Sequence, residues 1–154
     1  MPAKHEHPRN TPAPSWVYDD GGRAAAGWPA TTHDPGDCVA RALAIATGEP
    51  YADVYAGLAA LASELGGRRS ARDGVSRQVY DRWLADRGWA WVATMRVGQG
   101  CQVHLRADEL PAGRVIVRLS GHLAAVIDGA AHDTADPTRG GSRCVYGYWV
   151  RSTP

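Results

Sequence analysis

The chain has 154 residues, 44% of them hydrophobic and 21% charged, which is the balance of one ordinary globular domain. Its formal net charge of +1 gives no reason to expect a nucleic-acid partner. No run of residues approaches the roughly 18 consecutive apolar residues of a membrane span, so we expect none.

The N-terminal region and the cysteines indicate where the domain begins and which compartment it occupies. Residues 1–15 carry four prolines and few apolar side chains, which predicts a disordered tail before one domain over residues 16–154. The tail lacks the apolar run of a signal peptide. The three cysteines, Cys38, Cys101 and Cys144, form no C-x-x-C pair. An odd count at wide spacing predicts reduced thiols and a cytoplasmic protein.

Helical patterns occupy the first half of the chain. A helix is expected to begin at Asp37, whose carboxylate would cap the first-turn amides, and to end before Gly48 and Pro50. Apolar residues at helical spacing predict two more helices over 51–65 and 75–87. The remaining segments of this half, 16–34 and 66–74, read as an irregular ordered segment and a flexible basic loop.

Strand patterns dominate the second half. Strands are predicted over 89–95, 114–119 and 143–150, and a β-hairpin over 122–134 with Asp128-Gly129 at its tip. A short strand is also expected just after residue 102. Helices followed by antiparallel strands predict an α+β fold, in which N-terminal helices pack on a C-terminal antiparallel sheet.

Cys38 is the candidate for chemistry. A thiol at a helix N-terminus gains thiolate character from the helix dipole, although a free cysteine is also often a small buried apolar residue. A thiol nucleophile needs a base, and the base needs an orienting group. A two-residue turn in the hairpin would place His122 and Asp133 diagonally on one face. Asp136 has the opposite parity but precedes Pro137, where a bend would turn it inward, so both aspartates stay candidates.

The order of these residues resembles that of papain-like cysteine peptidases, and most closely the bacteriocin-processing peptidases of export transporters. The matching residues are Asp37-Cys38 followed by Leu43-Ala44-Ile45, then His122, then Asp136-Pro137. The resemblance implies a papain-like fold and a Cys-His-Asp triad. Transglutaminase-like proteins share the same order and a similar hairpin, and their aspartate would fall on Asp133 instead.

Two positions depart from the peptidase pattern. Thr32 stands where those peptidases place a glutamine that helps to form the oxyanion hole, and Val39 replaces the glycine that often follows the cysteine. Losing one oxyanion donor costs roughly 10²–10³ in rate. Another donor is therefore expected, such as Thr32 itself or a backbone amide near Gly36.

The sequence thus predicts a cysteine-dependent, peptidase-like hydrolase that forms a thioester with a peptide or protein substrate. Cys38 is the nucleophile, His122 the base, and Asp133 or Asp136 the orienting group. Two alternatives stay open: a binding or inhibitor module without turnover, and a deamidase or transglutaminase-type acyl transferase. No cofactor and no metal are expected, because Cys101, His104 and Cys144 match no zinc pattern. The oligomeric state is left open.

Overall fold

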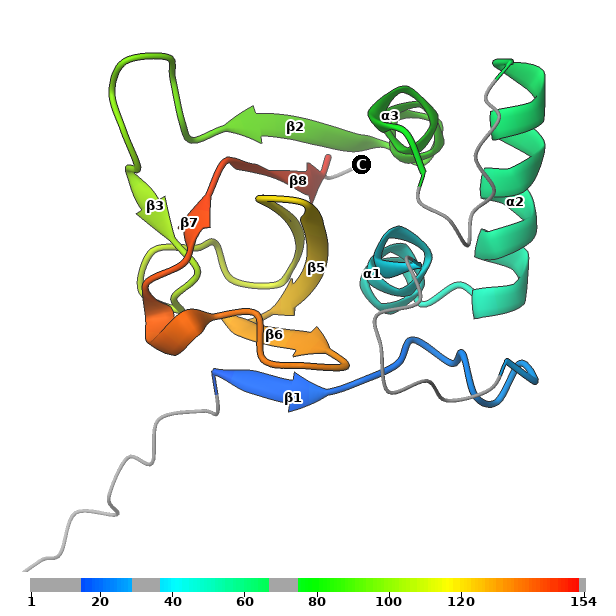
Figure 1. Cartoon of the computed structure of the whole chain (residues 1–154), viewed down its shortest axis with the longest axis horizontal. Helices are drawn as coiled ribbons and strands as arrows, with labels where there is room; N and C mark the ends of the chain where they lie inside the picture. The colour runs from blue at the N-terminus through cyan, green and yellow to red at the C-terminus, as the bar shows by residue number, and fades with distance from the viewer. Residues whose placement is uncertain (1–14, 29–36, 67–74, 153–154) are drawn as a thin grey trace, which may run out of the picture.

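The computed structural model of the chain describes residues 15–28, 37–66 and 75–152 (Figure 1). The helices are α1 (Cys38–Thr47), α2 (Tyr51–Glu64) and α3 (Arg77–Ala85), with a short 3₁₀ turn η1 (Arg139–Gly141). The strands are β1 (Trp16–Tyr18), β2 (Trp89–Ala93), β3 (Val103–His104), β4 (Arg114–Leu119), β5 (His122–Ile127), β6 (Ala130–Asp133), β7 (Cys144–Val145) and β8 (Gly147–Arg151). The predicted α+β class is confirmed. Most of the predicted tail and most of the predicted 66–74 loop lie outside the described residues.

A six-stranded sheet in the order β1-β6-β5-β4-β8-β2 forms the centre of the domain. Its pairings are antiparallel except that of β1 with β6, which is parallel. The sequence interpretation of residues 16–34 as irregular missed β1. A strand of three residues is too short to show alternation, and β1 takes its register from the hairpin it joins, with Tyr18 opposite Asp133.

The two faces of the sheet bury different sets of side chains. Ile116, Ala125 and Trp149 pack with the helices in one apolar cluster. The residues of opposite parity, Val117 and Val126, join a second cluster on the other face. Figure 1 shows the three helices together beside the sheet, with α1 between the strands and α2. None of these helices, the only ones in the part of the chain described, has the length and apolarity needed to cross a bilayer.

The predicted strand over 143–150 is divided in two. Its first part, β7, pairs with β3 in a separate two-stranded sheet, and its second part, β8, lies between β4 and β2. Gly147 begins β8 beneath the ring of Trp91, where an added Cβ would lie 2.2 Å from a ring carbon. A glycine in a strand often marks a site where another group approaches closely.

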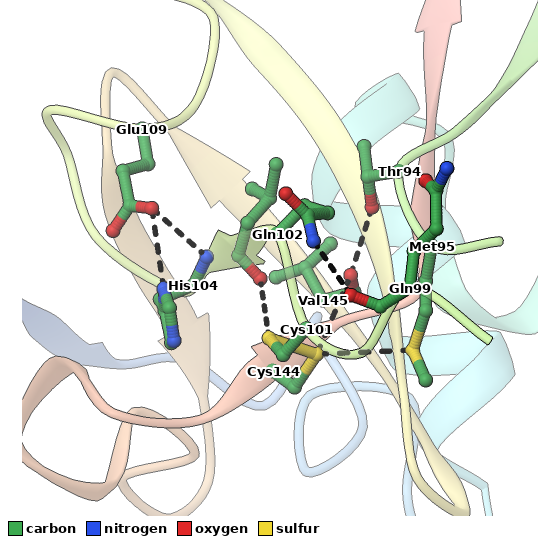
Figure 2. Close-up of a disulfide and its surroundings, with 10 residues drawn as sticks. Thr94, Met95, Gln99, Cys101, Gln102, His104, Glu109, Cys144 and Val145 are labelled. Carbon is green, nitrogen blue, oxygen red and sulfur yellow. Dashed lines mark hydrogen bonds and ion pairs between the residues drawn. A yellow bond between two sulfur atoms is a disulfide. The ribbon is translucent and has the colours of Figure 1, made fainter.

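A disulfide joins Cys101 to Cys144 and corrects the expectation of reduced thiols at these two positions. Figure 2 shows the bond between the loop after β2 and strand β7, with Met95 beside Cys144. The two cysteines are 43 residues apart and belong to no short motif, so their spacing carried no pairing signal. Cys38 is the free cysteine of the chain.

Candidate active site

Cys38 is the first residue of α1, and its side chain is only partly buried. The eight residues that follow it are all buried, because this helix packs against β5 and α2 with an apolar surface. The N–H groups of a first helical turn have no partner within the helix, and the helix dipole is positive there. Reactive cysteines are generally found at such positions.

The hairpin formed by β5 and β6 brings His122 and Asp133 together. Asp128 and Gly129 form its tip with φ angles of 49° and 82°, and Ile127 pairs with Ala130, as a two-residue turn predicts. The Nε2 atom of His122 lies 2.6 Å from Oδ2 of Asp133. The diagonal contact expected from strand alternation is therefore present.

The packing around the hairpin tip requires a glycine there. A Cβ added to Gly129 would lie 2.4 Å from the Cβ of Ala107 and 2.7 Å from its Cα. The left-handed φ of this residue also favours glycine. The close approach to Ala107 and the left-handed φ both require glycine in this turn. The turn sets the strand register that places His122 next to Asp133.

Asp133 and Cys38 both raise the pKa of His122. Burial lowers the pKa of His122, but hydrogen bonds with Asp133 and Cys38 outweigh it and raise that pKa from 6.5 to about 9. Because Nε2 faces Asp133, Nδ1 is the ring nitrogen left for the thiol. The imidazole therefore carries its second proton at neutral pH and is placed to share it with Cys38.

Asp136 lies outside this arrangement. Its side chain is exposed, and Oδ1 accepts hydrogen bonds from the backbone N–H of Thr138 at 2.9 Å and from its hydroxyl at 2.7 Å. The bend expected before Pro137 thus forms a local turn. Of the two candidate aspartates, Asp133 is the one against His122.

Asp37 does not cap α1, which corrects the sequence expectation. It makes no side-chain capping hydrogen bond, and its carboxylate is fully buried. Arg23 donates to Oδ2 at 2.6 Å, and Arg41 and the hydroxyl of Tyr51 also donate to this carboxylate. Burial, together with the hydrogen bond to Asp37, raises the pKa of Tyr51, so its hydroxyl stays protonated and remains a donor.

Arg41 continues this network towards the hairpin. Its guanidinium binds Asp37 with one nitrogen, while Nη2 lies 3.6 Å from Oδ1 of Asp133. Sequence reasoning missed Arg23, Arg41 and Tyr51. The signal for Arg41 was available, because it is a charged residue within an otherwise apolar helix surface. Arg23 and Tyr51 each lie 14 residues from Asp37, and no local rule connects them.

The described part of the chain holds no group of three His, Cys, Asp or Glu side chains placed to bind a metal ion. Cys101 and Cys144 are joined to each other, and Nδ1 of His104 lies 3.2 Å from a carboxylate oxygen of Glu109. The suggested second oxyanion donors, Thr32 and the backbone near Gly36, fall outside the described residues.

Comparison of the chain with protein-family models, with curated proteins and with solved structures finds no match.

Proposed function

We propose that the protein is a cysteine-dependent, peptidase-like hydrolase that works through a thioester. Its active-site residues would be arranged as in papain-like enzymes. The observation that carries the proposal is His122, whose Nε2 lies 2.6 Å from Oδ2 of Asp133 and whose pKa is raised by both Asp133 and Cys38. A helix-borne thiol, an imidazole and a carboxylate in this order satisfy the requirements of thiol nucleophilic catalysis.

The groups of the site suggest the following steps. The Cys38 thiolate attacks a substrate carbonyl carbon, a C–S bond forms, and the carbonyl electron pair moves to oxygen. The backbone N–H of Cys38 at the start of α1 donates to that oxygen. The tetrahedral intermediate collapses, the C–N bond breaks, and the His122 imidazolium protonates the leaving amine.

The second half of the reaction releases the acyl group. Neutral His122 accepts a proton from water, the resulting hydroxide attacks the thioester, and the C–S bond breaks to return the Cys38 thiolate. Asp133 holds the imidazole in one orientation throughout, because its carboxylate accepts a hydrogen bond from Nε2–H. A peptide or protein amide is the substrate class that this sequence of steps consumes.

One observation favours a second candidate, a transglutaminase-type transferase or deamidase. Strand register predicted that the aspartate of the transglutaminase-like proteins would fall on Asp133, and Asp133 is the residue that contacts His122. This candidate uses the same thioester, but the thioester forms from a glutamine side chain and ammonia leaves. A transglutaminase then passes the acyl group to an amine, and a deamidase passes it to water. A glutamine-containing peptide offered with a labelled primary amine distinguishes the candidates: a transglutaminase incorporates the label, a deamidase converts glutamine to glutamate and releases ammonia, and a peptidase cleaves the backbone.

The first test is the rate of iodoacetamide alkylation of Cys38 against pH, followed by mass spectrometry. The thiol of a free cysteine has a pKa of about 8.5. At about pH 6 we expect Cys38 to be alkylated roughly tenfold faster in the folded protein than in the unfolded chain, because the imidazolium of His122 stabilises the thiolate. His122→Ala should lose this advantage.

Matched variants separate the site from general effects on folding. His132→Ala removes the other histidine of the hairpin, whose Nδ1 lies 3.4 Å from Asp19, and should leave the alkylation profile unchanged. Asp133→Asn should reduce the reactivity at about pH 6, whereas Asp136→Asn should not. A Cys38 that reacts no faster in the folded protein than in the unfolded chain would contradict the proposal.

A further inference from the structure

We propose that Arg41 is a positioning residue. It would hold helix α1, which carries Cys38, against the β5–β6 hairpin, which carries His122. The proposal rests on the proposed function and adds to it a residue that neither the triad nor the resemblance includes. Arg41 lies on the same helix as Cys38, one turn further along, and reaches the carboxylate that orients His122.

The contacts of Arg41 connect the helix to the hairpin. On one side it forms an ion pair with Asp37, the residue immediately before Cys38. On the other side its Nη2 is 3.6 Å from Oδ1 of Asp133. Oδ1 of Asp133 also accepts a hydrogen bond from the backbone N–H of Thr134 at 2.8 Å, and Oδ2 is the oxygen that faces His122. One guanidinium therefore constrains both the start of α1 and the orientation of the Asp133 carboxylate.

The shape of the arginine side chain suits this role. Its side chain is 3% exposed, and the carboxylates it faces, on Asp37 and Asp133, are 0% and 7% exposed. A guanidinium presents several donors in a rigid plane, so one side chain can face two carboxylates at once. A lysine offers a single nitrogen on a flexible stem and would have to choose between them.

The charges of the site alternate along this connection. In the direction of Cys38 the order is Arg23, Asp37, Arg41, Asp133 and His122. Each buried charge thus has a neighbour of opposite sign, which offsets the cost of removing it from water. Arg41 is the member that links the support around Asp37 to the reactive pair.

The test compares Arg41→Lys with Tyr51→Phe. Both variants remove a contact to Asp37, but only Arg41 also reaches Asp133. The readouts are the protonation midpoint of the His122 ring, from NMR titration, and the alkylation rate of Cys38 at about pH 6. In Arg41→Lys we expect the His122 midpoint to move from about 9 towards 6.5 and the alkylation rate to fall roughly tenfold. Tyr51→Phe should lower stability but keep both readouts near wild type.

Several outcomes overturn the inference or support it. Equal changes of the His122 midpoint and the alkylation rate in Arg41→Lys and Tyr51→Phe would mean that both substitutions act only by destabilising the fold. Unchanged readouts in Arg41→Lys would mean that the link from Asp37 to Asp133 through Arg41 is not needed. A second variant keeps the inference testable in case Arg41→Lys does not fold. The double variant Asp37→Asn/Arg41→Gln then replaces both charges at constant net charge. It should show the same loss of reactivity, and wild-type reactivity in it would overturn the inference.

The wild-type protein separates failure of this inference from failure of the proposed function. If wild-type His122 titrates near 6.5 and Cys38 is unreactive, the proposed function fails together with the inference. If wild type shows the raised midpoint and the fast alkylation while the Arg41 variants match it, only the role of Arg41 is rejected.

Discussion

Single residues decide whether the hairpin delivers its side chains to the site, and Gly129 is the clearest case. We expect Gly129→Ala to lower the free energy of unfolding by about 2–4 kcal/mol, from about 1 kcal/mol of left-handed backbone strain plus overpacking against Ala107. Gly98→Ala is the matched control, because Gly98 has the same φ of 82° with nothing within 4 Å of its added Cβ. Urea unfolding of both variants checks the difference, and equal losses would show that the close approach to Ala107 does not matter.

Asp37 shows why a local rule can fail at a single residue. An aspartate before an apolar helix is normally a cap, because its carboxylate then satisfies the first-turn amides. Here two arginines and a tyrosine compete for the same carboxylate inside the protein. The two arginines carry full opposite charges, which a buried carboxylate needs more than it needs the neutral amides of the helix. Two of the three come from distant parts of the sequence, which is why the sequence alone could not reveal the outcome.

At the level of elements, the sequence predicted most where the signal was local. The three helices and the 122–134 hairpin were predicted, because helical spacing and the Asp-Gly turn are short-range patterns. The predicted two-residue turn also placed His122 and Asp133 diagonally on one face of the hairpin. Strand β1 and the division of 143–150 into β7 and β8 were missed, because pairing with distant strands decides both.

The disulfide between the loop after β2 and strand β7 makes an element-level prediction. In the loop-entropy model, a cross-link between residues 43 apart stabilises the fold by roughly 4 kcal/mol. We expect the double variant Cys101→Ser/Cys144→Ser to lose about 2–4 kcal/mol in denaturant unfolding under oxidising conditions. Cys38 alkylation should stay near wild type, because these elements contribute no side chain to the Cys38, His122 and Asp133 arrangement. A reductant should destabilise wild type and leave the variant unchanged, and equal sensitivity of both would contradict the prediction.

The stability of the whole molecule should depend on pH through His122. Its pKa is about 9 in the folded protein and 6.5 in the unfolded chain, so the folded state binds the proton more tightly. The resulting stabilisation is complete below about pH 6.5 and is lost as the pH rises through about 9. We expect the stability difference between wild type and His122→Gln to shrink over this interval. Unfolding curves of both proteins from about pH 6 to 9.5 check this, and a constant difference would contradict it.

The network around Asp37 also has a consequence for the order of events during synthesis. Arg23 and Tyr51 lie near the beginning of the chain, whereas His122 and Asp133 lie near its end. Strand β1 completes the arrangement, since the indole of Trp16 donates to the carbonyl of Asp133 across 117 residues of sequence. A ribosome must release most of the chain before these partners can meet. Under the proposed function, Cys38 would stay an ordinary thiol on the growing polypeptide and become reactive only when the fold is complete.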